Sequence, residues 1–125
     1  MAKHFLNIMR FENYGRIINF SSVVAQKGIP GTSAYAASKS ALWGMSKSIA
    51  EENASKGITI NTLNLGYFNI GMINEVSNEV QNIIKKQIPV GNDFGDPINI
   101  YNAVKFIFDS PYLTGTSINI NGGLF

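Results

Sequence analysis

Tyr35 and Lys39 are the two residues of this 125-residue chain that most directly suggest a chemical role. They lie four residues apart in a segment rich in Ala and Ser, so a helix would place both on one face, about 6 Å apart at Cβ. A phenol is a poor acid at neutral pH, and a neighbouring ammonium favours its ionised form, which makes it a better proton donor. Ser22 lies thirteen residues earlier, after an apolar run, and adds a hydroxyl. The three groups together could polarise a carbonyl and protonate its oxygen.

The spacing of the Tyr and the Lys is a weak signal when taken alone. Such a pair arises by chance in about one in five chains of this length, and its ordinary interpretation is an exposed pair on one helix face. The additional Ser after a buried strand, and the small residues Ala36, Ala37 and Ser38 between the pair, strengthen the chemical interpretation.

Strands and helices alternate along the chain, which predicts the α/β class with parallel strands joined by right-handed crossovers. We expect Ser33 to cap the long helix, Gly57 to end it, and Gly44 within it to have a close neighbour, because glycine destabilises a helix interior. The predicted strands are residues 16–20, 57–63 and 116–120, and the predicted helices are residues 1–11, 33–54, 74–87 and 97–108.

Three parallel strands are few for such a sheet, because both faces must be covered and both edges protected. The run at residues 16–20 is almost wholly apolar, as expected of a central strand, yet no earlier strand is predicted to lie beside it. The sequence therefore predicts either pairing with another copy of the chain or the C-terminal part of a larger fold.

Four motifs in order, spread over nearly the whole chain, resemble the short-chain dehydrogenase/reductase family. They are Gly15-Arg-Ile-Ile-Asn-Phe-Ser-Ser22, Tyr35-Ala-Ala-Ser-Lys39, Gly57-Ile-Thr-Ile-Asn61 and Asn121-Gly-Gly123. The similarity is to the C-terminal half of 3-oxoacyl-[acyl-carrier-protein] reductase-like members. It implies a partial Rossmann-like sheet that lacks the N-terminal βαβ half, with residues 1–125 as the C-terminal catalytic half of one reductase domain.

The resemblance also implies an activity, namely NAD(P)-dependent hydride transfer between a nicotinamide and a ketone or secondary alcohol. By the resemblance, Tyr35 is the general acid/base, Ser22 holds the substrate oxygen, and Lys39 bonds the nicotinamide ribose. Gly66 and Phe68 would contact the nicotinamide end of the cofactor. The choice between NAD and NADP stays open, as does the identity of the carbonyl or alcohol substrate.

The sequence departs from the family pattern at several positions. It contains no Gly-rich phosphate loop and no counterpart of the catalytic Asn, and Gly28-Ile-Pro-Gly31 is a poor substitute because Pro30 has no N–H to donate. The usual Pro-Gly after the second strand is Leu65-Gly66, and Ile70 replaces a cofactor-binding Thr. The alternative function is therefore a truncated member or fragment that binds no cofactor productively and self-associates.

Composition excludes several other classes of function. The chain has no Cys, one His and a net charge of +2 without any basic tract, which argues against a metal site, a disulfide framework and a nucleic-acid partner. No apolar run is long enough for a membrane span, and we expect a cytoplasmic protein. A homo-oligomer is expected through the Ser33–Ala54 helix and the last strand. Trp43 is expected to pack in a core or an interface.

Overall fold

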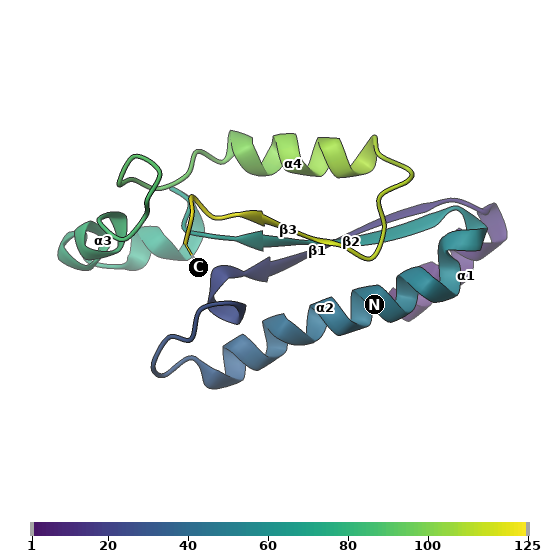
Figure 1. Cartoon of the computed structure of the whole chain (residues 1–125), viewed down its shortest axis with the longest axis horizontal. Helices are drawn as coiled ribbons and strands as arrows, with labels where there is room; N and C mark the ends of the chain where they lie inside the picture. The colour runs from purple at the N-terminus through teal and green to yellow at the C-terminus, as the bar shows by residue number, and fades with distance from the viewer. Residues whose placement is uncertain (1, 125) are drawn as a thin grey trace.

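A three-stranded parallel sheet between helices forms the fold of this protein (Figure 1). The structure is a computed structural model that describes residues 2–124. It confirms the predicted α/β class and all three predicted strands. The strands are β1 (Gly15–Ser22), β2 (Ile58–Leu65) and β3 (Ser117–Ile120); the helices are α1 (Ala2–Glu12), α2 (Ser33–Asn53), α3 (Asn78–Lys85) and α4 (Ile98–Phe108); and the 3₁₀ turns are η1 (Val23–Ala25), η2 (Ala54–Lys56) and η3 (Gly71–Glu75).

The strand order is β1-β2-β3, so β2 lies in the centre of the sheet and seven of its eight residues are buried. Within residues 2–124, β1 is an edge strand, as expected because no earlier strand is predicted to lie beside it. The register pairs Ser22 with Leu65, and Leu65 in turn with Ile120. The carboxyl ends of all three strands therefore meet at one edge of the sheet, which is where open α/β sheets bind ligands.

Helices α2 and α4 cover opposite faces of the sheet (Figure 1). Ser46 of α2 bonds Thr62 of β2, whereas Leu63, the next residue of β2, packs with Ala103 and Ile107 of α4. The β1–β2 and the β2–β3 connections both move in the same direction across the sheet. Two right-handed crossovers in one direction would place their helices on the same face, so α2 and α4 on opposite faces mean that the two crossovers differ in hand. The prediction of right-handed crossovers is therefore wrong for one of them. The connection from β2 to β3 carries η3 and α3 before α4, and this long path takes the chain to the other face.

The ends of α2 are set by turn chemistry. Thr32, not Ser33, occupies the N-cap position, and its hydroxyl donates to the Ile29 carbonyl instead of capping the helix. Gly57 closes the segment as predicted, in the left-handed region at φ +68°, where a Cβ would lie 2.6 Å from the Asn13 carbonyl oxygen. Among the described residues nothing lies within 4 Å of a Cβ at Gly44, so the predicted close neighbour is not found within the chain.

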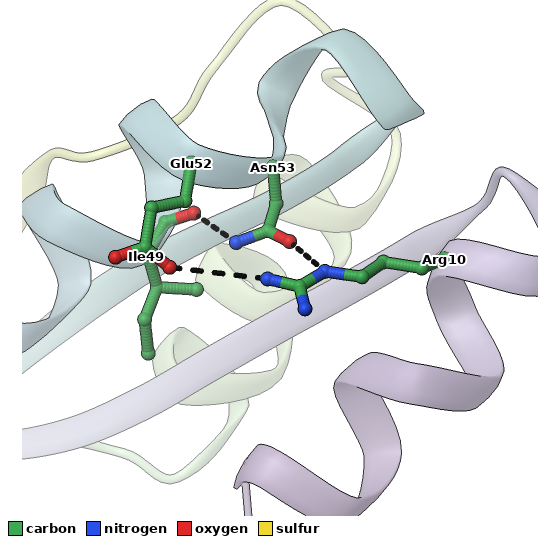
Figure 2. A network of polar contacts seen from close by, with 4 residues as sticks. All are labelled: Arg10, Ile49, Glu52 and Asn53. Carbon is green, nitrogen blue, oxygen red and sulfur yellow. Dashed lines mark hydrogen bonds and ion pairs between the residues drawn. The ribbon is translucent and has the colours of Figure 1, made fainter.

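Helix α1 is attached to the C-terminal end of α2 by a polar cluster (Figure 2). The Arg10 guanidinium donates to Oδ1 of the fully buried Asn53 at 2.6 Å and pairs with Glu52 at 3.8 Å. The Asn53 amide in turn donates to the Ile49 carbonyl. Because Asn53 has no contact with water, these bonds fix the orientation of α1 beside α2.

The segment after β2 differs most from its prediction. A helix was predicted over residues 74–87, but α3 begins only at Asn78, because the Ser77 side chain caps it by accepting from the Val80 N–H. Strand β2 also runs two residues past its predicted end, to Leu65. In the part of the chain that is described, no helix is both long and apolar enough to cross a membrane.

Candidate active site

A cavity of about 420 Å³ opens at the carboxyl edge of the sheet, between the end of β1, the first turn of α2 and the segment after β2. Four hydroxyl-bearing residues line it: Ser22, Thr32, Tyr35 and Tyr67. The rest of the wall is apolar apart from the backbone at Gly66, and is formed by Val24, Phe68, Ile70, Met72, Ile73, Val76 and Ile84. Among the described residues no Asp, Glu, Lys, Arg or His lines this cavity. Its chemistry therefore suits a neutral ligand with an apolar substituent and an oxygen that accepts hydrogen bonds.

Ser22 ends β1 and begins the 3₁₀ turn η1 as its N-cap. Its Oγ accepts a hydrogen bond from the Val24 N–H at 3.2 Å. A hydroxyl that accepts one bond in this way can still donate its own proton. Ser22 is therefore a fixed hydroxyl that can donate into the cavity.

Tyr35 lies in the first turn of α2, with 42% of its surface exposed. The Lys39 ammonium lies 5.7 Å from the centre of the Tyr35 ring, as the spacing of four residues predicts. Lys39 itself does not line the cavity: its Nζ donates to the Phe20 carbonyl at 2.9 Å, on the edge strand β1. An ammonium has three donors, so two remain for other partners.

Gly66 and Phe68, the other predicted site residues, also line the cavity. The Gly66 N–H donates to the Ile120 carbonyl, and a Cβ at Gly66 would lie 2.7 Å from the Asn121 Cα, so the close passage of the chain requires glycine there. Phe68 is buried, and its ring fills the space beside Gly95, where a Cβ would lie 2.7 Å from a ring carbon.

Tyr67 is a candidate that sequence reasoning missed. Its side chain is half-buried, and burial raises the pKa of the Tyr67 phenol, with a further increase from the neighbouring Tyr35. The signal available in the sequence was only an aromatic residue between Gly66 and Phe68. Because its pKa is raised, the Tyr67 phenol keeps its proton and can serve as a hydrogen-bond donor to a ligand.

A larger cavity of about 830 Å³ lies between α4, β3 and residues 88–97. It shares Tyr67 and Phe68 with the smaller cavity but contains none of Ser22, Tyr35 and Lys39. We therefore place the candidate active site in the smaller cavity. Within residues 2–124, no group of three or more His, Cys, Asp or Glu side chains is arranged to hold a metal ion.

The parallel sheet brings hydroxyl groups and a lysine to its carboxyl edge, which defines an α/β protein with a candidate site where open α/β sheets bind ligands. A family model described as Enoyl-(Acyl carrier protein) reductase matches residues 1–125. The chain belongs to the short-chain dehydrogenase/reductase family, as its motifs suggested.

Individual relatives agree with this assignment. The chain is 42% identical to the 3-oxoacyl-[acyl-carrier-protein] reductase FabG of Rickettsia bellii, over 93% of this chain and 48% of the relative. It is 38% identical to FabG of Haemophilus influenzae, over 100% of this chain and 52% of the relative. It is 39% identical to the 3-oxoacyl-[acyl-carrier-protein] reductase of Bos taurus, over 95% and 48%. The chain thus spans about half the length of the curated relatives it matches.

Proposed function

We propose that residues 1–125 form the C-terminal catalytic half of a Rossmann-type reductase domain, and that this half supplies the acid/base groups for reduction of a ketone. The observation that supports this most is that Ser22 and Tyr35 line one uncharged cavity, with the Lys39 ammonium beside the Tyr35 ring. The match to about half the length of the relatives, and the unpaired edge of β1 within residues 2–124, support the assignment of the chain as one half of a domain.

In the proposed reaction, Ser22 donates a hydrogen bond to the carbonyl oxygen of the substrate and so polarises the C=O bond. Its bond from the Val24 N–H orients the hydroxyl for this role. The Tyr35 hydroxyl then transfers its proton to the same oxygen as the carbonyl becomes an alcohol. Such a positioned proton donor typically contributes about 10²–10⁴-fold to the rate.

A nicotinamide cofactor, NAD or NADP, supplies or accepts the hydride when it is bound. The residues present fit one end of it, because Lys39 has two free donors beside Tyr35 that suit ribose hydroxyls. Gly66 and Phe68 would lie against the nicotinamide end. A backbone cradle for the pyrophosphate is not among the described residues, so that part of the cofactor needs groups from elsewhere.

The substrate class that we propose is a 3-oxoacyl group, which is the group that the relatives' names give as theirs. A 3-oxoacyl chain is neutral around its ketone, which agrees with a cavity wall without charged side chains among the described residues. The apolar part of that wall, from Val24 to Ile84, would contact the acyl chain.

The second candidate function is that of a family member that self-associates without productive cofactor binding. Large apolar side chains of α1 are exposed, namely Phe5, Ile8 and Phe11, and Met45 of α2 is 38% exposed. Contacts between copies through α2 and β3 would cover exposed parts of the chain. Sedimentation of the purified chain tests this function, and a monomer would contradict it.

The deciding experiment is a titration of the purified chain with NADPH and with NADH, followed by cofactor fluorescence. We expect saturable binding that is lost in Lys39→Ala and kept in Lys47→Ala, an exposed lysine two turns further along α2. Absence of binding by the wild-type chain would favour the second candidate function.

Turnover of a short 3-oxoacyl thioester tests the role of Tyr35. Tyr35→Phe should lower the rate about 10²–10⁴-fold, because the proton donor is removed while the ring remains. Tyr101→Phe is the matched control, since Tyr101 is 61% exposed and lines neither cavity. Activity retained in Tyr35→Phe would refute the proposed acid/base role.

A further inference from the structure

A row of uncharged side-chain hydrogen bonds crosses the sheet from α2 to the turn after Ser22. The Trp43 indole N–H donates to Asn64 Oδ1 at 2.8 Å, and the Asn64 amide donates to Asn119 Oδ1 at 2.8 Å. The Gln26 amide donates to the same Asn119 oxygen at 2.9 Å. We call these four residues the polar bridge; they connect α2, β2, β3 and the C-cap of η1.

The indole of Trp43 fixes the direction of every bond in the polar bridge. An indole N–H is only a donor, so the Asn64 side chain must present its oxygen to Trp43 and its NH₂ to Asn119. Asn119 must then present its oxygen, and Gln26 must present its NH₂. Flipping Asn64 or Asn119 would set donor against donor, and flipping Gln26 would set its oxygen against the Asn119 oxygen, so the bonds support a single arrangement of all four side chains.

The two ends of the polar bridge lie on the segments that carry the candidate catalytic groups. Trp43 follows Lys39 by four residues and Tyr35 by eight, so the three side chains lie on one face of α2 in successive turns. Gln26 caps the C-terminal end of η1, the 3₁₀ turn whose N-cap is Ser22. The polar bridge therefore links the helix of Tyr35 and Lys39 to the turn of Ser22 by a path separate from the main chain.

We propose that Trp43, Asn64, Asn119 and Gln26 are positioning residues that set the placement of Ser22 relative to Tyr35 and Lys39. This inference rests on the proposed function of those three groups. Its physical basis is that Asn64, in the middle of the bridge, is 2% exposed, so its own amide is shielded from water, while Asn119 and Gln26 at the far end of the bridge are exposed. A shift of about 1 Å between reacting groups can cost about a hundredfold in rate, so such a link matters to turnover.

A second link between α2 and the sheet provides a matched control. The Ser46 hydroxyl bonds the Thr62 hydroxyl at 3.0 Å and accepts from the Asn19 amide at 3.0 Å. Ser46 is 1% exposed, which matches the burial of Asn64, but its partners lie within β2 and β1 and not at η1. Ser46→Ala therefore removes a buried link from α2 to the sheet and leaves the polar bridge whole.

The test is amide NMR of the full 125-residue chain, which requires no turnover. In Asn64→Ala we expect the amide signals from Ser22 to Gln26 and those around Tyr35 to shift together, with faster hydrogen exchange in η1. In Ser46→Ala the signals of η1 should stay in place. If Asn64→Ala does not fold, Gln26→Ala breaks the last bond of the bridge at an exposed side chain. Signals that change only beside the substituted residue, or equally in Ser46→Ala, would overturn the proposal.

Asn119 allows a rescue experiment, because its single oxygen accepts both bonds. Asn119→Asp keeps that acceptor and should keep the wild-type amide spectrum of η1, whereas Asn119→Leu should give the spectrum of Asn64→Ala. In turnover, Asn64→Ala should lower kcat about tenfold to a hundredfold and leave KM nearly unchanged. A change in KM alone would overturn the positioning role. Failure of Tyr35→Phe to affect turnover would instead refute the proposed function, and the NMR result separates the two.

Discussion

Gly44 lies in the interior of α2, where glycine is the least favourable residue after proline. Its φ is helical, it is exposed, and within the described residues no heavy atom lies within 4 Å of a Cβ built there. Gly44→Ala therefore adds a methyl group without a clash and removes backbone freedom from the unfolded chain. We expect the free energy of unfolding to rise by about 1 kcal/mol. For a chain of this size, that is an increase of about 4 °C in Tm.

The matched control for Gly44→Ala is the same substitution at Gly57, with the opposite expected sign. Gly57 has φ +68°, and a Cβ there would lie 2.6 Å from the Asn13 carbonyl oxygen. The left-handed conformation alone costs a residue with a Cβ about 1–2 kcal/mol. Gly57→Ala should therefore lower the free energy of unfolding by at least about 1 kcal/mol.

Thermal unfolding followed by Trp43 fluorescence measures both glycine variants, since Trp43 is the only Trp in the chain. A lower Tm for Gly44→Ala would refute the reasoning that this position faces open space. If that loss of stability also grew with protein concentration, a second copy of the chain would be packed against α2. The same comparison therefore tests the expected self-association through this helix.

Three further perturbations follow from the structure. Asn53→Ala removes the buried acceptor of Arg10 and should lower the free energy of unfolding, measured in urea, by about 1–3 kcal/mol. Arg10→Met is the companion variant, which leaves the Asn53 oxygen without its donor. Ile107→Ala, at a fully buried position on the sheet-facing side of α4, should cost about 2–5 kcal/mol, and a smaller loss would mean that the core collapses into the space left by the side chain. The hydrogen bond from Lys85 lowers the pKa of Asp93, so this pair stabilises the fold above the ordinary aspartate pKa and the contribution is lost as pH falls through the lowered value. Asp93→Asn should therefore reduce the dependence of stability on acidic pH, and an unchanged profile would contradict that sign.

Much of the candidate site could be predicted from local sequence signals. Ser22 ends an apolar strand, and Tyr35 and Lys39 are one helical turn apart, so strand and helix geometry placed them near one edge of the sheet. The structure brings Ser22 and Tyr35 to one cavity. The Lys39 ammonium lies outside the lining of that cavity, on the Phe20 carbonyl of β1, and this contact depends on how α2 packs against β1.

The apolar wall and the contribution of Tyr67 could not be predicted, because they depend on how the segment after β2 folds back. That segment carries short elements whose ends are set by single side chains, such as the Ser77 cap of α3. The apolar periodicity that predicted a helix over residues 74–87 begins before Ser77, whereas the helix itself begins after it. Side-chain capping outweighed the periodic pattern, so the positions of Met72, Ile73 and Val76 along the cavity followed from the tertiary structure.

The α/β class, the order of the strands and helices, and the family could be predicted from local sequence patterns, because these depend on periodicity and on motifs within short stretches. The three-dimensional packing shows which faces α2 and α4 cover, and therefore that the two crossovers differ in hand. It alone decided the polar bridge, whose bonds join residues 21, 55 and 93 positions apart. Hydrogen bonds over such separations depend on strand register and on helix placement, and no local pattern of residue types specifies either one.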